Sequence, residues 1–493
     1  MRCGRCFVSL STLGVDVYQL TTLIAHAADG RLAQPPLGMS FFFRRLPKNR
    51  NFVVTTGIAS IVEFCRDLRF CAADFETLDQ HPLLGPALRT APGQQVRAAL
   101  QRLDGFVGDI DALPEGTLAF AGPARRLDGS PVAFAGVPLV AYTPLLQATT
   151  DLVTAKLIET PWLSRLNYLS MVASKAARVV QAARCDGIER TVLEFGQRRT
   201  HPQAAVDAAY AAYLAGCSAT SNLAATQRHG IPSVGTMDHF AIQAVEQLGI
   251  PVTDTEGQFF ARFCDLFPEA ATLLVDTYDT WRGIETAVRA TGGRCTGIRI
   301  DSGVTVDSVR RAKALLAELG APHVKVLVSD GLDEYRVREL ARAGADGFGV
   351  GENITCSPDA ATGVGAVGKL VLNGYGKLTM KLAKGSGKAT LPGMLQAYRF
   401  ADHDVLTFAD EAPLAGGQPL LQPLWRGHAP CAGLPSLAVR RAEVQRQIAA
   451  LPSHLSALEC PPADAPTGAA AWPLLLSDRL FETIQQLIAT AAT

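Results

Sequence analysis

The sequence predicts an α/β fold with a parallel sheet at its centre. From about residue 190 to 355, short apolar runs alternate with longer amphipathic ones, which is the pattern of successive βα units. The units recur roughly every 25 residues, a spacing that favours a barrel or a doubly wound sheet. Small and polar residues follow the apolar runs, as they do where strand-end loops of such sheets form a site.

Six apolar runs in this region are candidate strands. After the fourth, apolar side chains recur at helical spacing from Val306 to Leu319, and Asp333 is placed to cap a later helix that stops near Gly344. The candidate strands are residues 191–195, 233–236, 272–277, 297–301, 324–329 and 347–350.

The segments on either side differ in character and predict a further layer. Residues 1–150 contain the strand-like run Phe41 to Phe43 and a second β-rich stretch from Gly116 to Val140, so we expect an N-terminal α+β domain. A long amphipathic stretch at 151–190 leads into the domain that ends near residue 355. Residues 356–493 are expected to be β-rich and then helical around 478–488, and to pack on the N-terminal domain.

Charge and cysteine content exclude several classes of protein. Lys plus Arg and Asp plus Glu each number 46, so no global field attracts nucleic acid. No apolar run approaches the ~18 residues of a spanning helix, and we interpret the chain as a soluble cytoplasmic protein. The eleven cysteines suit reduced thiols. Cys3 and Cys6 have the spacing of half a zinc site, but no second pair completes it, so no metal site is predicted.

Polar clusters follow all six candidate strands. Because the carboxyl ends of parallel strands share one edge of the sheet, we expect these clusters to converge into one site. They are FGQRR at 195–199, GTMDH at 235–239, DTYD at 276–279, RIDSG at 299–303, SDG at 329–331 and GVG at 349–351.

Glycines and arginines in these clusters suit an anionic ligand such as a sugar phosphate. Gly331, Gly349 and Gly351 allow backbone N–H groups to approach a phosphate, although each alone is equally typical of a tight turn. Three arginines lie just after or at the end of strands, where a guanidinium binds carboxylate or phosphate: Arg198, Arg199 and Arg299. Solvated surface arginines are the alternative.

Acidic and imidazole groups on the same edge supply candidate chemistry. Four aspartates could balance the arginines, bind Mg²⁺ or orient a histidine: Asp276, Asp279, Asp301 and Asp330. His239 follows a small-residue turn that exposes an imidazole toward the site. A lone histidine is more often structural, but its place among the clusters favours a functional role.

Taken together, six motifs resemble the nicotinate phosphoribosyltransferases, from about residue 14 to the terminal helix. They are DVYQLT at 16–21, FFFRRLP at 41–47, EFGQRR at 194–199, GTMDH at 235–239, RIDSG at 299–303 and GFGVG at 347–351. The resemblance implies an irregular α/β barrel of the type II phosphoribosyltransferase kind, with an additional β-rich domain formed from N- and C-terminal segments.

The resemblance also implies a reaction. Such enzymes join nicotinate to 5-phosphoribosyl 1-diphosphate in NAD biosynthesis, giving nicotinate mononucleotide and diphosphate. The reaction uses Mg²⁺ and is coupled to ATP hydrolysis through a phosphorylated histidine, as in an ATP-dependent ligase, and His239 matches that histidine. A homodimer with a shared active site is implied.

Individual roles follow from the matched motifs. The resemblance implies that Tyr18, from the partner subunit, and Phe195 stack on nicotinate and that Arg299 pairs with its carboxylate. Arg198 and Thr236 would hold the ring or the ribose phosphate. Asp301 is expected to contact the ribose, and Asp276 to orient His239. Gly331, Gly349, Gly351 and Glu352 complete the expected substrate-binding set.

Three positions depart from the family's pattern. Val304 replaces an expected aspartate, Glu352 an expected threonine beside the phosphate cradle, and Asp238 an expected alanine beside His239. These changes bear on phosphate contacts and ATP coupling more than on the class of reaction.

Three other functions remain open at this stage. One is a relative that uses nicotinamide, and another is a catalytically silent ligand-binding paralogue, which Val304 and Glu352 suggest. The third is a barrel aldolase, but it needs a lysine at a strand end and none of the six clusters contains one.

Overall fold

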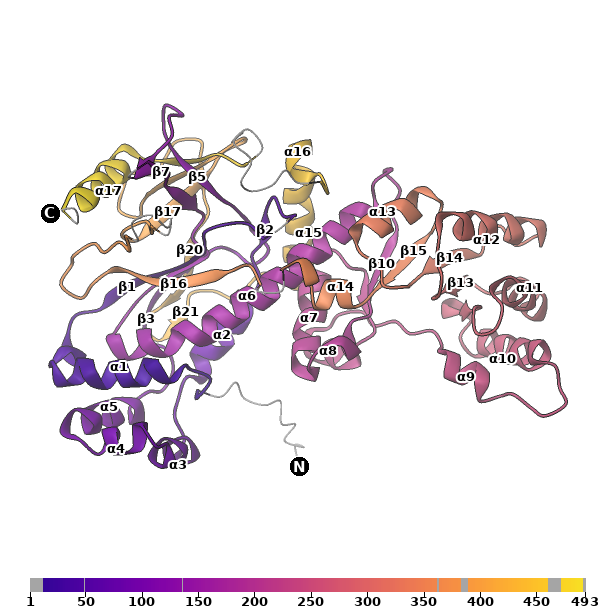
Figure 1. Cartoon of the computed structure of the whole chain (residues 1–493), viewed down its shortest axis with the longest axis horizontal. Coiled ribbons are helices and arrows are strands. Elements are labelled where there is room, and N and C mark those ends of the chain that lie inside the picture. Colours follow the sequence, from indigo (N-terminus) through magenta and orange to yellow (C-terminus); the bar gives the residue numbers. More distant parts are fainter. Residues whose placement is uncertain are drawn as a thin grey trace. The chain divides into compact units, whose positions relative to one another are not determined.

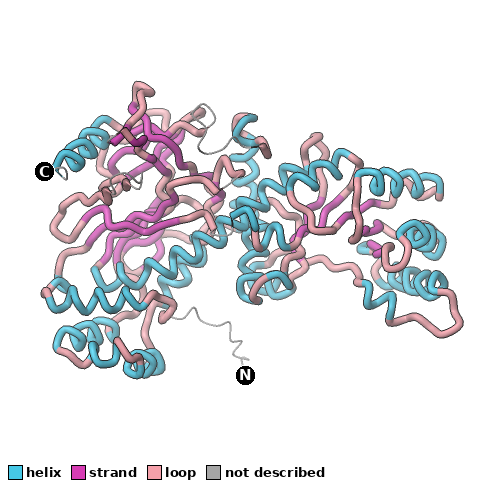
Figure 2. The backbone as a smooth tube through the Cα atoms, viewed as in Figure 1, coloured by secondary structure: helices cyan, strands magenta, loops and turns pink. Residues whose placement is uncertain are grey.

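The computed structural model describes residues 12–47, 49–134, 136–360, 363–382, 389–459 and 471–490. The chain divides into two compact units (Figures 1 and 2): one contains the described residues within 1–171 and 362–493, and the other those within 172–361. Helix α6, Leu152–Ala183, occupies the predicted amphipathic stretch. Its first part belongs to the first unit, so the division falls later than the predicted border at residue 150.

The unit within 172–361 is built on a six-stranded sheet in which every pair of neighbours is parallel. The strand order is β11-β10-β15-β14-β13-β12, and among the described residues no ladder joins β11 to β12. Strand pairing therefore leaves the sheet open and does not close the predicted barrel. The strands are β10 Thr191–Glu194, β11 Ala219–Thr220, β12 Thr272–Leu274, β13 Gly297–Ile300, β14 Lys325–Val328 and β15 Gly347–Val350.

Helices follow the strands as the alternating pattern predicts. Asp333 caps α13 through its Oδ1, which accepts the Arg336 N–H, as expected from the sequence. Apolar side chains of the strands, such as Ile298, Val326 and Phe348, are fully buried beneath them. The helices are α7 Pro202–Leu214, α8 Leu223–His229, α9 His239–Gln243, α10 Val252–Leu266, α11 Thr280–Thr291, α12 Val306–Glu318, α13 Glu334–Arg342 and α14 Glu352–Thr355, with 3-10 turns η2 Gln197–Arg199, η3 Pro268–Ala270 and η4 Pro358–Ala360.

One predicted strand is wrong, and one strand was missed. Residues 233–236 contain only an isolated bridge, from Ser233 to Thr220, and then run as a loop to α9. Pro232 lacks an N–H to donate and Gly235 weakens extended pairing, which limits the contact to that bridge. The strand beside it, β11, is only two residues long, too short to leave a periodic signal.

The other unit contains two six-stranded sheets that join distant parts of the chain. Their orders are β16-β1-β9-β3-β20-β21 and β19-β17-β18-β22-β5-β8. Strands from before residue 171 pair with strands from after 362: β1 with β16, β3 with β20, and β5 with β22. The strands are β1 Leu37–Phe43, β2 Val53–Val54, β3 Gly108–Ala112, β4 Leu118–Ala119, β5 Ala121–Arg126, β6 Ala133–Phe134, β7 Val137–Pro138, β8 Val140–Tyr142, β9 Leu146–Thr150, β16 Ala366–Leu372, β17 Leu395–Arg399, β18 Asp404–Phe408, β19 Gln418–Pro419, β20 Gln422–Arg426, β21 Ala429–Pro430 and β22 Leu474–Leu476.

The helices of this unit come from both the N-terminal and the C-terminal parts of the chain. The run Phe41 to Phe43 is fully buried in β1, where Phe42 stacks on Tyr142 with ring centroids 3.7 Å apart. The helices are α1 Val17–Ala28, α2 Ile58–Asp67, α3 Ala72–Gln80, α4 Leu84–Leu88, α5 Ala91–Gln101, α15 Leu437–Ala449, α16 Ser453–Ser456 and α17 Asp478–Thr490, with the 3-10 turn η1 Arg31–Ala33. The last helix confirms the one predicted around residues 478–488.

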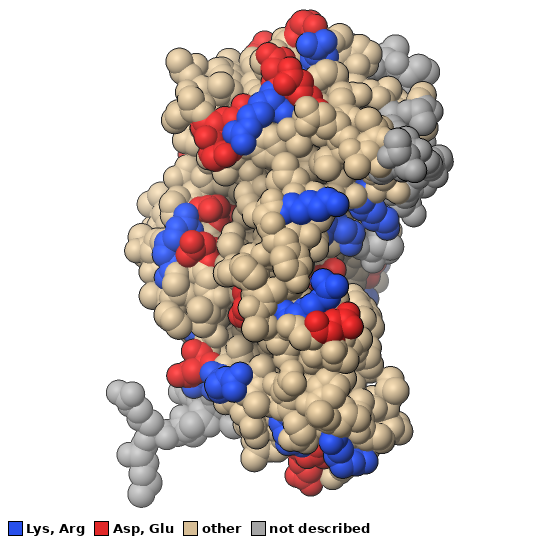
Figure 3. Space-filling view, turned by 90° about the vertical axis from the view of Figure 1, so that its left-hand side faces the viewer, with Lys and Arg blue, Asp and Glu red and all other residues tan. Residues whose placement is uncertain are grey.

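The surface carries charges of both signs. On the face drawn in Figure 3, Lys and Arg side chains are interspersed with Asp and Glu, as the equal totals in the sequence predict. Within the described ranges, none of the helices combines the length and the hydropathy that a membrane span requires.

The buried carboxyl of Glu256, on α10, should make the free energy of unfolding depend on pH. Its side chain is buried, Oε1 has no hydrogen-bond partner among the described residues, and burial raises the pKa of this carboxyl to about 7. The folded state therefore holds this proton more tightly than the unfolded state does. Its stability falls as pH rises from the unfolded pKa, near 4.5, through about 7.

We expect Glu256→Gln to remove this loss of stability and to raise the free energy of unfolding at pH 8 by about 1–3 kcal/mol, with little change at pH 4.5. Thermal unfolding at both pH values measures the difference, and Glu318→Gln, at an exposed position of α12, is the control. An equal effect of Glu256→Gln at both pH values would contradict the assignment.

Candidate active site

The strand-end clusters meet at one edge of the parallel sheet. Strands β10, β15, β14, β13 and β12 are consecutive neighbours, so the residues that follow them lie at the same edge. The remaining cluster, 235–239, lies on the loop after the Ser233 bridge and is tied to the edge by side-chain contacts. All six clusters belong to the unit within residues 172–361.

Arg299, in β13, anchors that loop. One terminal nitrogen donates to the Thr236 hydroxyl at 3.0 Å, and the other donates to the Met237 carbonyl at 3.1 Å. Its Nε lacks a partner among the described residues. Burial lowers the pKa of the guanidinium, while the carboxylates of Asp301 and Asp276 raise it. The site thus contains a desolvated cation with a donor still available for an anion.

His239 opens helix α9 and contacts a residue that the sequence analysis did not select. Its Nδ1 lies 3.1 Å from the Thr277 hydroxyl. The expected partner, Asp276, is beyond hydrogen-bond distance, since its Oδ1 lies 4.0 Å from Nε2. Asp276 thus lies near the imidazole without hydrogen-bonding to it, and its expected role in orienting His239 stays a prediction. Thr277 could have been found because it belongs to the cluster that follows β12.

A series of carboxylates continues along the edge. Asp276 Oδ2 accepts the Asp301 N–H at 2.8 Å, and Asp276 Oδ1 is buried without a hydrogen-bond donor among the described residues. The Ser329 hydroxyl donates to Asp301, and Asp330 accepts the Val304 N–H at 3.2 Å. These contacts hold the ends of β12, β13 and β14 together and leave one carboxylate oxygen for a ligand.

Two other polar residues of the clusters have structural partners. Asp279 caps α11, where its Oδ1 accepts the N–H groups of Trp281 and Arg282 at 3.1 and 2.9 Å. Asp238 caps α9 by accepting the Ala241 N–H at 3.0 Å. The carboxylate that departs from the family's pattern beside His239 therefore stabilises a helix start.

The packing of Phe195 explains the glycine in β15, Gly349, and the glycine just after it, Gly351. A Cβ on Gly349 would lie 2.5 Å from the Phe195 ring, and one on Gly351 would lie 3.2 Å from the Phe195 carbonyl. The Phe195 N–H donates to the Val350 carbonyl at 2.9 Å. Gly331, after β14, has a φ of 57° and open space around it, so its conformation requires glycine and its surroundings do not.

Glu352 is held by an arginine of the neighbouring cluster. Its Oε2 lies 3.3 Å from Arg199, and each side chain is nearly half exposed. Arg198, next to Arg199 in η2, is close enough to Arg299 for its charge to lower the pKa of that group, after the larger effects of burial and the carboxylates. The unexpected anion at position 352 is thus neutralised by Arg199, which the pairing of β10 with β15 brings close to it.

We expect Glu352→Gln to lower the free energy of unfolding by less than ~1 kcal/mol, because exposed ion pairs contribute little. The difference from the unchanged chain should shrink further at high salt. Urea unfolding at low and high ionic strength measures both. A salt-independent loss of several kcal/mol would contradict the exposed pair.

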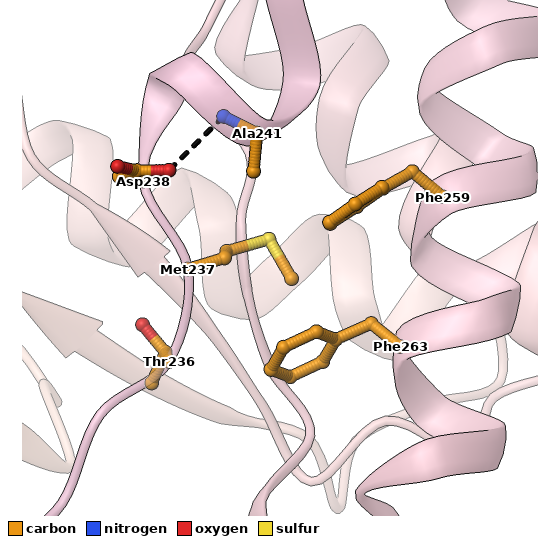
Figure 4. Close-up of a pocket in the computed structure, with 6 residues that line it drawn as sticks. All are labelled: Thr236, Met237, Asp238, Ala241, Phe259 and Phe263. Carbon is orange, nitrogen blue, oxygen red and sulfur yellow. Dashed lines mark hydrogen bonds between the residues drawn. The ribbon is translucent and has the colours of Figure 1, made fainter. Parts of the chain in front are cut away.

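A pocket of about 400 Å³ lies beside the loop that Arg299 holds. Figure 4 shows the Thr236–Asp238 loop and Ala241 on one side and the rings of Phe259 and Phe263 on the other. Met237 points between the two walls. The pocket combines an apolar interior with the hydroxyl that Arg299 contacts, which suits a ligand with a flat apolar part.

Tyr18 lies in the other unit, at the start of α1. Its side chain is half exposed, the Lys156 ammonium lies 5.5 Å from its ring centroid, and its hydroxyl accepts from Gln19 Nε2 at 3.1 Å. Burial, followed by the charges of Glu159 and Asp16, raises the pKa of its hydroxyl. The ring is therefore held in place but available for contact.

Metal ligands are sparse in the described part of the chain. No group of three or more His, Cys, Asp and Glu side chains there is arranged to hold a metal ion. Cys3 and Cys6 lie outside the described residues.

Comparison with known proteins decides the family. Residues 191–407 match the model of the nicotinate phosphoribosyltransferase (NAPRTase) family. Nicotinate phosphoribosyltransferase pncB2 of Mycobacterium tuberculosis is 33% identical over 97% of this chain and 94% of its own length. The chain belongs to the nicotinate phosphoribosyltransferase family. Nicotinate phosphoribosyltransferase of Homo sapiens is 29% identical over 96% of both chains.

Solved structures agree with the family. The crystal structure of human nicotinic acid phosphoribosyltransferase matches with a TM-score of 0.73 and 27% identity, over 97% of this chain and 99% of that one. Nicotinate-nucleotide pyrophosphorylase from Pyrococcus furiosus shares the fold, with a TM-score of 0.66 and 23% identity over 89% and 96% of the two chains. The mixed α/β architecture of this chain is thus that of its family.

Proposed function

We propose that this chain joins nicotinate to 5-phosphoribosyl 1-diphosphate in NAD biosynthesis, forming nicotinate mononucleotide and diphosphate. The observation that carries the proposal is the likeness to nicotinate phosphoribosyltransferases along almost the whole chain. The desolvated Arg299, at the same edge of the sheet as Phe195, is suited to an aromatic acid, because a guanidinium pairs with a carboxylate more strongly than with a neutral amide.

In the proposed reaction, the lone pair of the pyridine nitrogen forms a bond to the anomeric carbon as the bond to the diphosphate oxygen breaks. No nucleophile from the protein is required. The protein positions the two substrates and stabilises the positive charge that develops on the sugar. Asp301 and Asp276, on neighbouring strands, place negative charge at this edge of the sheet.

Mg²⁺ fits the carboxylates of the site without a complete protein cage. Mg²⁺ in phosphate-transferring sites is held by one or two carboxylates and by the substrate's own phosphate oxygens. Asp276, after β12, has a buried oxygen without a donor among the described residues, and Asp330 follows β14 at the same edge of the sheet, with β13 between the two strands. When bound, the ion would neutralise the departing diphosphate.

We further propose that ATP transfers its γ-phosphoryl group to His239, releasing ADP, and that water later removes it as phosphate. The imidazole is partly exposed, and Thr277 contacts one of its nitrogens. Fixing one ring nitrogen selects the tautomer that leaves the other as a nucleophile.

The proposed reaction is tested by measuring mononucleotide formation from nicotinate and from nicotinamide, each with 5-phosphoribosyl 1-diphosphate and Mg²⁺, with and without ATP. We expect nicotinate to be used with a much higher kcat/KM and ATP to stimulate the rate. Preference for nicotinamide would identify the relative that uses the amide. No turnover of either base would identify a silent ligand-binding paralogue.

We also propose a homodimer in which Tyr18 of one subunit enters the partner's site. Val17 and Tyr18 are exposed on their own unit, and Phe240, Leu248, Leu266 and Phe267 are exposed on the other. These exposed apolar side chains are available to be buried against a second subunit.

Mixed dimers test the shared site. Tyr18→Ala and His239→Ala are each expected to lose ATP-stimulated activity. Random mixing of the two should restore about a quarter of it, since half of the dimers then contain one intact site. No recovery in dimers shown to have exchanged subunits would place both residues in the same subunit's site.

A further inference from the structure

Glu194 is a buried carboxylate that the proposed reaction does not use. It ends β10, which lies between β11 and β15 in the sheet, and only 1% of it is exposed. Its Oε1 accepts the Gly196 N–H and the Thr355 hydroxyl, the latter at 3.1 Å, and its Oε2 accepts the Thr220 hydroxyl at 2.7 Å. The three donors belong to β11, to the turn after β10 and to α14 after β15.

The directions of these hydrogen bonds suit an ionised carboxylate. The Asn222 N–H donates to the Thr220 hydroxyl at 3.1 Å, which directs the Thr220 proton toward Glu194. The Gly196 N–H can only donate. Burial raises the pKa of Glu194 above its ordinary value, and the three hydrogen bonds offset only part of that rise. An amide in its place would turn an N–H donor toward one of these groups, and so would reverse or lose one of the bonds that the carboxylate accepts.

The carboxylate fixes the turn that contains two expected substrate contacts. Gly196 packs so closely that a Cβ there would lie 1.7 Å from the Thr355 hydroxyl. Glu352, in the same short helix as Thr355, pairs with Arg199 in that turn. The backbone carbonyl of Glu194 accepts the Ser221 N–H at 3.0 Å. The turn is therefore bound to its neighbours on both sides.

We propose that Glu194 is a positioning residue for nicotinate. Its carboxylate locks the turn 195–199 against β11 and α14, so that the Phe195 ring and the backbone that carries it are ordered before the base binds. This inference rests on the proposed function. Ordering these groups in advance lowers the entropy lost on binding, so the gain appears in the affinity for the base.

Thr355 offers a matched pair of variants that leave Glu194 in place. Thr355→Val keeps the shape and removes one donor, whereas Thr355→Ser keeps the donor. We expect Thr355→Val and Glu194→Gln to raise KM for nicotinate about tenfold, with KM for 5-phosphoribosyl 1-diphosphate within about twofold. Thr355→Ser should stay close to the unchanged chain. Equal changes in both KM values, or no rescue by serine, would reduce Glu194 to a general stabiliser and overturn the proposal.

Hydrogen exchange separates this inference from the proposed function. In Thr355→Val, peptides that cover 195–199 and 220–222 should exchange faster than in the unchanged chain, while α12 exchanges at the same rate. If the turn exchanges at the same rate in Thr355→Val as in the unchanged chain, the positioning role is overturned, whichever base the chain uses. If the turn opens as expected but the unchanged chain makes no mononucleotide, the proposed function fails and the choice of nicotinate as the positioned ligand fails with it.

Discussion

Replacing His239 by alanine is expected to abolish the stimulation of mononucleotide formation by ATP and to leave a slow, ATP-independent rate. The ring is the proposed phosphoryl acceptor, and alanine has no group to take its place. The ATP-dependent kcat/KM should fall on the order of 100-fold or more, while the rate without ATP changes little. Initial rates with and without ATP measure the ratio.

His323 is a suitable control for this experiment. It lies in the same unit, and its Nε2 contacts the Gly293 carbonyl at 2.9 Å, so it has a structural partner and no place in the proposed site. His323→Ala should retain ATP stimulation. Full stimulation by ATP in His239→Ala would refute the phosphohistidine. The rate of mononucleotide formation from nicotinate would still test the phosphoribosyl transfer separately.

Gly349→Ala is expected to lower activity nearly as much as His239→Ala does, but through a steric clash. The new Cβ would lie 2.5 Å from two atoms of the Phe195 ring, a separation that requires the ring to move. Overpacking of this kind destabilises by about 1–3 kcal/mol. If Phe195 stacks on nicotinate, the displaced ring should also lower kcat/KM for nicotinate on the order of 100-fold.

Gly433→Ala provides the matched control, because a Cβ there meets nothing within 4 Å and the residue has no positive φ. It should leave stability and kinetics unchanged. Steady-state kinetics and thermal unfolding of both variants decide the outcome. A Gly349→Ala enzyme with the original KM for nicotinate would show that the ring position does not affect the base.

Much of the βα architecture could be read from local patterns. The strand at 347–350 and the helix starts at Val306 and Glu334 follow from apolar periodicity and capping residues within a few positions. The segment 233–236 misled that reasoning, since its apolar residues look like a strand but its pairing depends on a partner of two residues. Pairing partners are distant in sequence, so local patterns do not reveal them.

The sequence alone determined most of the residues at the strand ends, and the parallel arrangement then brought Arg299, Asp276 and Asp301 to one edge, while contacts with Arg299 brought the loop of His239 there. Only the tertiary structure decided how those side chains are paired. It placed Thr277 and not Asp276 on the imidazole, turned Arg299 onto Thr236, and neutralised Glu352 with Arg199. The physical reason is the distance along the chain over which each kind of information acts. The patterns that predict strands and helices extend over a few residues, whereas these hydrogen bonds join residues tens of positions apart and depend on differences of tenths of an ångström.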